Sequence, residues 1–304
     1  MTNRGRLLLI LRMPYKNAIA ITIDNNYVQH ACVMLLSLSA NITENVNVYC
    51  IYSDLNETSK KRIVKELKGS RININFVEFN TAVLPHLPIK TNDHVSAAAF
   101  LRIWLPDLFP DFDQLLFIDT DIVINGDLTE LLNFTVPDQP LAAIPDTGMS
   151  VEKRASLSMA PDVLYFNSGV MVLNLAYFRQ HELTQQIARF IDEYPELCEF
   201  WDQDAFNAVI KGNFYVLDFK YNVLGAFYEA PQTDAAILKA MENPVTIHYT
   251  GGGKCKPWMY QNEHPHQGLY YKYLKLSSFR GYIPPDLPRS WRIFRKLKFR
   301  LFYK

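Results

Sequence analysis

The fold and the chemistry of this chain are indicated most clearly by Leu115-Leu116-Phe117-Ile118-Asp119-Thr120-Asp121. Four large apolar residues form a strand pattern that ends abruptly in two aspartates, spaced i and i+2. Because residues i and i+2 of a strand lie on the same side, both carboxylates would point toward one place. Ligands bind beyond the carboxyl ends of strands in open α/β sheets, and oxygen ligands suit Mn²⁺ or Mg²⁺. The segment favours a metal site that could hold a diphosphate, although a solvated turn with ordinary acidic residues has the same pattern.

Patterns typical of strands and helices alternate around this segment. Strands are expected at 18–23, 46–52, 72–79, 115–118, 168–174 and 245–249. Helices are expected at 28–39, 58–67, 96–105 (closed by Pro106), 177–194 (stopped by Pro195) and 202–210. Alternation of this kind predicts an α/β fold with a largely parallel sheet and helices on both faces.

The composition limits the class of protein. Apolar residues make up 49% of the 304 residues, which is enough for a sizeable core, as one large domain or one domain with an appended segment. The 31 basic and 31 acidic residues balance, which argues against a general nucleic-acid-binding protein. The four cysteines are scattered, so neither a cysteine zinc site nor a dense disulfide framework is expected, and a reducing compartment is favoured.

The two ends of the chain differ from the middle. We interpret residues 1–17 as an N-terminal leader, because Arg12 interrupts its apolar run too early for a signal peptide. Residues 276–304 form a C-terminal tail, predicted to be helical, in which seven basic residues are mixed with aromatic ones after Gly281. Such a mixture suits peripheral contact with an anionic membrane, and the alternative is a helix that packs on the body with a solvated basic face. Residues 18–275 would then be the main domain.

A glycine-rich motif follows the last predicted strand and runs from His248 to Trp258. Consecutive glycines from Gly251 allow the backbone to approach phosphate oxygens closely, and Lys254 and Lys256 could neutralise phosphate charge. His248 ends the strand and could complete the carboxylate metal site. A lone histidine is more often structural, but its position before this basic loop favours a ligand.

Two further pairs of polar residues lie at the ends of predicted strands or helices. Asp24 and Asn26 come after the first strand and could meet a nucleotide, or they could form only a turn and helix cap. Asp202 and Gln203 open a short helix, where they could serve a sugar site, or Asp202 could be a simple N-cap.

Taken together and in this order, the motifs resemble family 8 of the retaining glycosyltransferases. The likeness is nearest to bacterial lipopolysaccharide galactosyl- and glucosyltransferases, with glycogenin more distant, and it covers about residues 18–275. The motifs that carry it are Asp119-Thr120-Asp121, Tyr165-Phe166-Asn167-Ser168-Gly169-Val170, Asp202-Gln203-Asp204 and His248-Tyr249-Thr250-Gly251 through Lys256-Pro257-Trp258.

The resemblance implies a GT-A (Rossmann-like) fold and a retaining hexosyltransferase that moves galactose or glucose from a UDP-sugar to a glycan or lipid-linked acceptor, such as lipopolysaccharide or lipooligosaccharide. It implies Mn²⁺, with Mg²⁺ as an alternative, bound by Asp119, Asp121 and His248. Catalytic roles around the transferred sugar would fall to Gln203 and Asp202. Donor-binding positions would be Thr22, Asp24, Asn26, Arg102, Asp119, Thr120, Asp121, Asn167, Gly251, Lys254 and Lys256.

One departure concerns the glycine-rich loop, which is longer than in relatives. Lys254 keeps the family's distance from His248, whereas Lys256 keeps the Pro-Trp context, and we favour Lys256 as the residue that holds the diphosphate. The implied location is the cytoplasm, at the inner face of the cytoplasmic membrane.

The residues leave several alternatives open. Retention could proceed by front-face attack or by double displacement, for which Asp202 or Asp204 would be a better nucleophile than Gln203. Other possible functions are a nucleotide-sugar hydrolase, a catalytically idle binding protein and a glycogenin-like protein that glycosylates one of its own 17 tyrosines. The hexose, the acceptor and the oligomeric state are not specified by the sequence.

Overall fold

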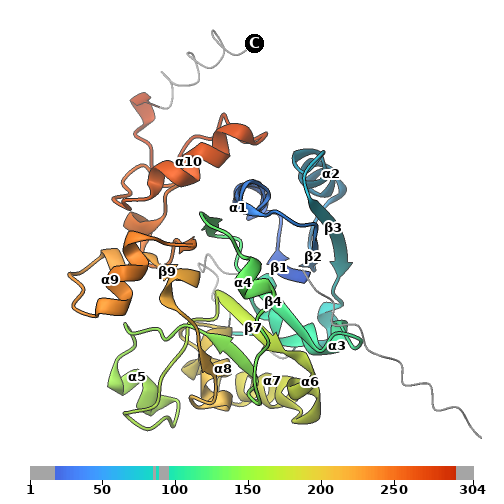
Figure 1. Cartoon of the computed structure of the whole chain (residues 1–304), viewed down its shortest axis with the longest axis vertical. Helices are drawn as coiled ribbons and strands as arrows, with labels where there is room; N and C mark the ends of the chain where they lie inside the picture. Colours follow the sequence, from blue (N-terminus) through green and yellow to red (C-terminus); the bar gives the residue numbers. More distant parts are fainter. Residues whose placement is uncertain (1–17, 85–86, 89–95, 292–304) are drawn as a thin grey trace, which may run out of the picture.

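The computed structural model of the chain describes residues 18–84, 87–88 and 96–291, and its main feature is a seven-stranded sheet of order β3-β2-β1-β4-β7-β6-β8 (Figure 1). The chain also forms a second, three-stranded sheet of order β5-β10-β9. The strands are β1 (Ala18–Ile23), β2 (Val46–Tyr52), β3 (Ile72–Glu78), β4 (Gln114–Ile118), β5 (Ile122–Ile124), β6 (Leu141–Ala143), β7 (Val170–Asn174), β8 (Tyr215–Val216), β9 (Val223–Leu224) and β10 (Thr246–His248).

The helices follow the strands in an alternating order through the first half of the chain. The α-helices are α1 (Val28–Asn41), α2 (Glu57–Glu66), α3 (Leu105–Leu108), α4 (Thr129–Leu132), α5 (Val151–Ser156), α6 (Leu175–Gln180), α7 (Leu183–Glu193), α8 (Asp202–Ile210), α9 (Ala235–Glu242) and α10 (Gln267–Leu276). Short 3₁₀ helices are η1 (Thr81–Val83), η2 (Ala97–Trp104), η3 (Pro195–Leu197), η4 (Phe219–Tyr221), η5 (Gly225–Tyr228) and η6 (Gly253–Cys255).

The predicted α/β fold with a mainly parallel sheet is confirmed. Strands β3, β2, β1 and β4 are parallel, while β7 runs antiparallel to both β4 and β6. The parallel part puts the carboxyl ends of β1 and β4 at the same edge, which is where an α/β sheet offers room for a ligand.

Each face of the large sheet is covered by its own apolar core. Alternate residues of β1 point to opposite faces, so that Ile19 and Ile21 join the core beneath α1 and α2, while Ala20 joins the core built with η2, α3, α6, α7 and α8. Strand β4 divides its side chains in the same way, with Leu116 and Ile118 in the first core. Burial on both faces holds the ends of β1 and β4 in fixed positions.

The second sheet brings a distant part of the chain to the end of β4. Strand β5 starts directly after the two aspartates, and β10 pairs with it antiparallel, with His248 opposite Ile122. The backbone N–H of Tyr249 also donates to the carbonyl of Asp121 at 3.1 Å. His248 is therefore held beside Asp121 by backbone pairing.

Three sequence-based boundaries were wrong. The helix expected at 96–105 is 3₁₀, and Pro106 does not close it but sits in the first turn of α3, where a missing N–H costs nothing. The long helix expected at 177–194 is broken into α6 and α7 by Glu182, which takes a left-handed conformation with φ 53°. The strand expected from 168 begins at Val170, because Ser168 and Gly169 form a turn, and Asn167 and Ser168 line the cavity described below.

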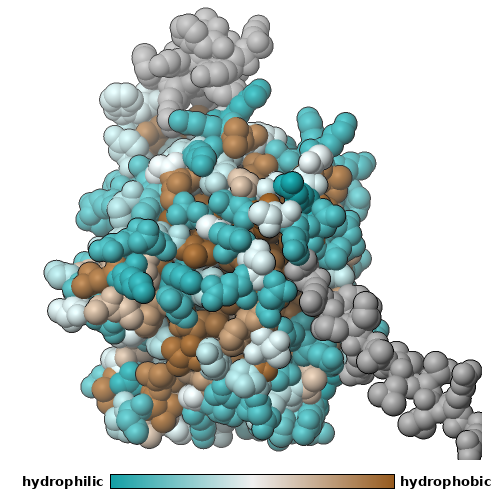
Figure 2. Space-filling view, viewed as in Figure 1, coloured by the Kyte–Doolittle hydropathy of each residue, from teal (hydrophilic) through white to brown (hydrophobic). Residues whose placement is uncertain are grey.

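The chain beyond the second sheet packs α10 against α1. Tyr270, Tyr273 and Leu274 of α10 form a small core with Val33 of α1. The predicted leader (1–17) lies outside the described residues, as do residues 292–304 of the basic tail. Within the part of the chain that the structure describes, no helix has the length and apolar character needed to cross a membrane. Hydrophilic residues cover most of the face shown in Figure 2, with apolar residues interspersed.

Candidate active site

A cavity of about 760 Å³ lies at the carboxyl ends of β1 and β4, between the large sheet and the second sheet. Most of the residues predicted to hold the metal, bind the donor or act in catalysis line it: Thr22, Asp24, Arg102, Asp119, Thr120, Asp121, Asn167, Asp202, Gln203, His248, Gly251 and Lys256. Two do not: Asn26 is exposed, and Lys254 points to the surface, where it pairs with Glu263 at 3.0 Å.

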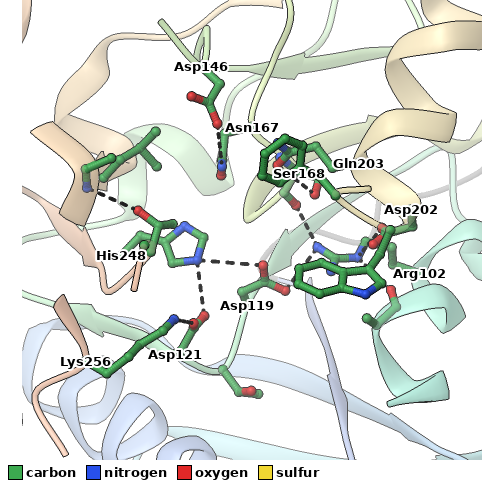
Figure 3. A pocket seen from close by; sticks show the side chains of 18 of the residues that line it. Arg102, Asp119, Asp121, Asp146, Asn167, Ser168, Asp202, Gln203, His248 and Lys256 are labelled. Carbon is green, nitrogen blue, oxygen red and sulfur yellow. Dashed lines mark hydrogen bonds and ion pairs between the residues drawn. The ribbon is translucent and has the colours of Figure 1, made fainter. Parts of the chain in front are cut away.

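Asp119, Asp121 and His248 form a cluster at the wall of this cavity (Figure 3). One ligand atom from each lies within 4.8 Å of the others. His248 Nε2 is 3.1 Å from Asp121 Oδ1 and 3.9 Å from Asp119 Oδ2. Two carboxylates and an imidazole that converge in this way can hold one divalent cation.

Lys256 adds a positive charge to the same place. Its Nζ is 3.0 Å from Asp121 Oδ2 and also donates to the carbonyl of Tyr249. Burial would raise the pKa of the Asp121 carboxyl, but Lys256 and His248 outweigh burial and hold that pKa well below its usual range. Asp121 is therefore a carboxylate at any physiological pH, as a metal ligand must be. The lengthened loop folds as η6, which turns Lys256 inward and Lys254 outward.

Arg102 connects the metal-binding end of the cavity with its other end. This buried guanidinium places Nη1 3.0 Å from Asp119 Oδ1 and Nε 2.8 Å from Asp202 Oδ2, and Nη1 also donates to the carbonyl of Ser168. Burial raises the pKa of Asp202 to about 7, against the opposing effect of Arg102. Burial likewise raises the pKa of Asp119. Arg102 thus fixes two carboxylates that would otherwise be costly to bury.

The far end of the cavity is lined by amide and hydroxyl groups. Gln203 Oε1 accepts a hydrogen bond from the backbone N–H of Ser168 at 3.0 Å, which leaves its amide nitrogen for other partners. Asn167 Nδ2 donates to Asp146 Oδ2 at 3.3 Å. Burial raises the pKa of Asp146, while hydrogen bonds from Asn167, Gly148 and Gln203 lower it. Polar groups of this kind suit the hydroxyls of a sugar.

Asp146 and Trp201 are among the cavity residues that the sequence analysis did not assign to the site. Asp146 follows β6, a three-residue strand that gives no recognisable alternation. Trp201 lines the cavity beside Asp202 with φ 51° and ψ −126°, a conformation that bulky residues rarely adopt and that tends to occur at functional sites. Its position directly before the Asp202-Gln203 motif was the only signal available.

Comparison with known proteins identifies the family. Residues 18–262 match the family model described as Glycosyl transferase family 8. The chain belongs to glycosyltransferase family 8. It is 28% identical over 268 residues to General stress protein A of Bacillus subtilis (strain 168), covering 84% of this chain and 92% of that protein. It is also 28% identical over 282 residues to a lipopolysaccharide 1,2-glucosyltransferase of Escherichia coli (strain K12), covering 90% of this chain and 80% of that one.

Solved structures place this family 8 chain in the same fold. The galactosyltransferase LgtC, solved in complex with donor and acceptor sugar analogs, superposes with a TM-score of 0.74 over 90% of this chain and 99% of its own, at 22% identity. The bifunctional glycosyltransferase WbbM matches with a TM-score of 0.71 at 22% identity, covering 87% of this chain and 50% of that one. The predicted GT-A architecture is confirmed, and at these identities the likeness concerns the fold.

Proposed function

We propose that this family 8 glycosyltransferase transfers galactose or glucose from the corresponding UDP-sugar to a glycan acceptor, with retention of configuration and with Mn²⁺ as cofactor. The observation that carries the proposal is the convergence of Asp119, Asp121 and His248 at the wall of the cavity, with Lys256 beside them. Positive charge stabilises a leaving diphosphate, and here the candidate cation site and Lys256 would supply it at one place.

The donor atoms are of kinds that Mn²⁺ binds. Two carboxylate oxygens and one imidazole nitrogen form a mixed set that Mn²⁺ accepts, and Mg²⁺ is the alternative because oxygen ligands predominate. A bound cation would supply Lewis-acid stabilisation of the negative charge that develops on the leaving diphosphate. Lys256 would contribute further positive charge to the same phosphate oxygens, while Gly251 and the following loop lie along the cavity wall.

The nucleotide and the sugar would occupy opposite sides of the cation. Thr22 and Asp24 line the cavity at the end of β1, where a uridine could lie. Asn167, Asp202 and Gln203 line the other end, where they would orient the transferred hexose. Asp202 Oδ2 is paired with Arg102, and Gln203 Oε1 accepts a hydrogen bond from Ser168. Both side chains are thus held by protein partners, which favours orientation of the sugar and front-face attack over a covalent intermediate.

For the acceptor we propose a lipopolysaccharide or lipooligosaccharide glycan. The proposal rests on the likeness to the Escherichia coli lipopolysaccharide 1,2-glucosyltransferase and on the basic composition of residues 276–304. That tail would contact the inner face of the cytoplasmic membrane through its lysines and arginines. Three alternative functions differ from this one in their products. A nucleotide-sugar hydrolase would release the free hexose, a self-glycosylating protein would carry the hexose itself, and an idle binding protein would form no product.

The experiment is to measure UDP release from a panel of UDP-sugars with Mn²⁺ and with EDTA, in the wild type and in Asp121→Asn. We expect release from one hexose donor that requires Mn²⁺, and a loss of at least about 100-fold in the variant, since a metal contributes several kcal/mol to such a step. Asp138→Asn, at an exposed carboxylate, is the matched control and should keep full activity. Equal activity of Asp121→Asn would refute the metal role, and product analysis by mass spectrometry separates transfer from hydrolysis and from self-glycosylation.

A further inference from the structure

The orientation of the His248 ring is set by a buried chain of side-chain amides. His248 Nδ1 lies 3.0 Å from Asn222 Oδ1, and Asn222 Nδ2 donates to Asn167 Oδ1 at 2.9 Å. Asn222 is fully buried, and Asn167 is 5% exposed. Asn222 lies between η4 and β9 and was not among the residues singled out from the sequence.

The donor and acceptor of each hydrogen bond between these side chains can be assigned, starting from the bond that Asn167 makes with the backbone of Gly169. The backbone N–H of Gly169, which can only donate, lies 3.0 Å from Asn167 at the atom assigned as Oδ1, so that atom must be the oxygen. The nitrogen of Asn167 then faces the Asp146 carboxylate, an acceptor, at 3.3 Å. The two anchors agree on the same orientation of the Asn167 amide.

The Asn167 assignment fixes Asn222 and then His248. Since Asn167 presents an oxygen, the Asn222 atom facing it must be the amide nitrogen. The other atom of the same amide, which faces His248 Nδ1, must be the oxygen. An oxygen facing a ring nitrogen in a buried place requires that nitrogen to carry the proton. Nδ1 is therefore occupied as a donor to Asn222, and Nε2, which lies 3.1 Å from Asp121 Oδ1 within the ligand cluster, is the ring nitrogen left to bind a cation in place of that contact.

We propose that Asn222 is a positioning residue that holds His248 in the tautomer able to bind the metal through Nε2. The inference rests on the proposed metal site and adds a residue that acts through His248 without touching the substrate. The same chain of amides continues through Asn167 to Asp146, so the metal side and the sugar side of the cavity are joined by buried hydrogen bonds.

The His248 ring has little room to turn, because it packs against the backbone of Gly169. A Cβ built on Gly169 would lie 2.2 Å from His248 Cε1 and 2.5 Å from Nδ1, so the ring packs directly on the Gly169 backbone. Loss of the Asn222 acceptor would free the ring to place its proton on Nε2, where it would compete with the cation. Partners of this kind typically change metal affinity by about 10–100-fold.

The test measures Mn²⁺ binding to the full chain by calorimetry or by electron paramagnetic resonance, without any donor. We expect Asn222→Leu to weaken Mn²⁺ binding about 10–100-fold, with much of the UDP release restored at saturating Mn²⁺. Asn222→Asp keeps an acceptor for Nδ1–H and should bind Mn²⁺ more tightly than Asn222→Leu. Asn174→Leu is the matched control, because this asparagine bonds the carbonyl of Gln139 and the N–H of Tyr177 at the end of β7 away from the cavity and should leave Mn²⁺ affinity unchanged.

A spectroscopic measurement on the wild type does not depend on whether a variant folds. In the Mg²⁺-loaded protein, long-range ¹H–¹⁵N correlations of the His248 ring should show a protonated Nδ1. A bare Nδ1 would overturn the proposal, as would a folded Asn222→Leu with wild-type Mn²⁺ affinity. If the wild type bound no Mn²⁺ at all, the proposed metal site itself would fail, whereas unaltered binding in Asn222→Leu alone would refute only the role of Asn222.

Discussion

Gly169 is the residue at which one added methyl group should disable the metal site although no ligand is replaced. The Cβ of an alanine there would stand 2.2 Å from His248 Cε1 and 2.5 Å from Nδ1. Carbon atoms in contact normally stay about 3.5–4.0 Å apart, so the ring must retreat by roughly 1.3 Å or more. The backbone of Gly169 is not left-handed, since the positive-φ glycines of the described residues are Gly69, Gly212 and Gly251. The penalty in Gly169→Ala therefore comes from the ring and not from backbone strain.

A retreat of that size exceeds what a metal site tolerates. Ligand distances hold to within about 0.2 Å, and a displacement near 1 Å typically costs about 100-fold in rate. We expect Gly169→Ala to weaken Mn²⁺ binding and to lower UDP release by about 100-fold, with an overpacking cost of about 1–3 kcal/mol in the free energy of unfolding.

The assay combines Mn²⁺ calorimetry, Mn²⁺-dependent UDP release and urea unfolding. Gly268→Ala is the control, because a Cβ at that position of α10 meets nothing within 4 Å. The control should bind Mn²⁺ like the wild type. A folded Gly169→Ala with wild-type Mn²⁺ affinity and activity would show that His248 does not occupy the position on which the metal site depends.

Two further predictions concern the loop and the buried histidines. Lys256→Met should lower the affinity for UDP, and the rate at which the enzyme produces UDP from the UDP-sugar, by at least about 10-fold. Lys254→Met should change neither, because Lys254 pairs only with exposed Glu263 among the described contacts. Equal effects of the two variants in a calorimetric UDP titration would contradict this assignment. Burial lowers the pKa of His30 from 6.5 to about 4, so the unfolded chain binds a proton that the folded protein does not, and stability should fall as the pH drops from about 6.5 to 4 by up to about 3 kcal/mol from this group. Urea unfolding at a series of pH values should show a shallower decline in His30→Gln, and identical slopes would refute this.

Much of the parallel half of the sheet could be predicted from the sequence, because its strands are long and apolar. The expected ranges of β1 and β2 match the observed ones, and the apolar run before Asp119 is a strand buried on both faces. Parallel strands covered by helices read as continuous apolar runs, which is a strong local signal. The position of Asp119 and Asp121 at a strand end followed directly.

The remaining parts depend on contacts that short segments do not encode. Strand β6, which precedes Asp146, and strand β9, which follows Asn222, have three and two residues, too few to show a period. The break at Glu182 involves neither glycine nor proline, so no local rule marks it. The choice between Lys254 and Lys256 depends on how η6 winds, which again is set by packing and not by spacing.

The way in which the candidate ligands are held explains why the site can exist before a cation arrives. Asp121 and His248 are tied together by backbone pairing between β5 and β10, including the bond from Tyr249 N–H to the Asp121 carbonyl. Asp119 is tied separately, through its own N–H to the Gly169 carbonyl and through its carboxylate to Arg102. The ligands thus lie where two sheets meet, and both sheets pack into a shared core that joins Ile118 of β4 with Ile122 of β5, so little ordering would remain to oppose binding. The same arrangement makes the site sensitive to small changes at the junction of the sheets, where Gly169, Asn222 and His248 are in contact.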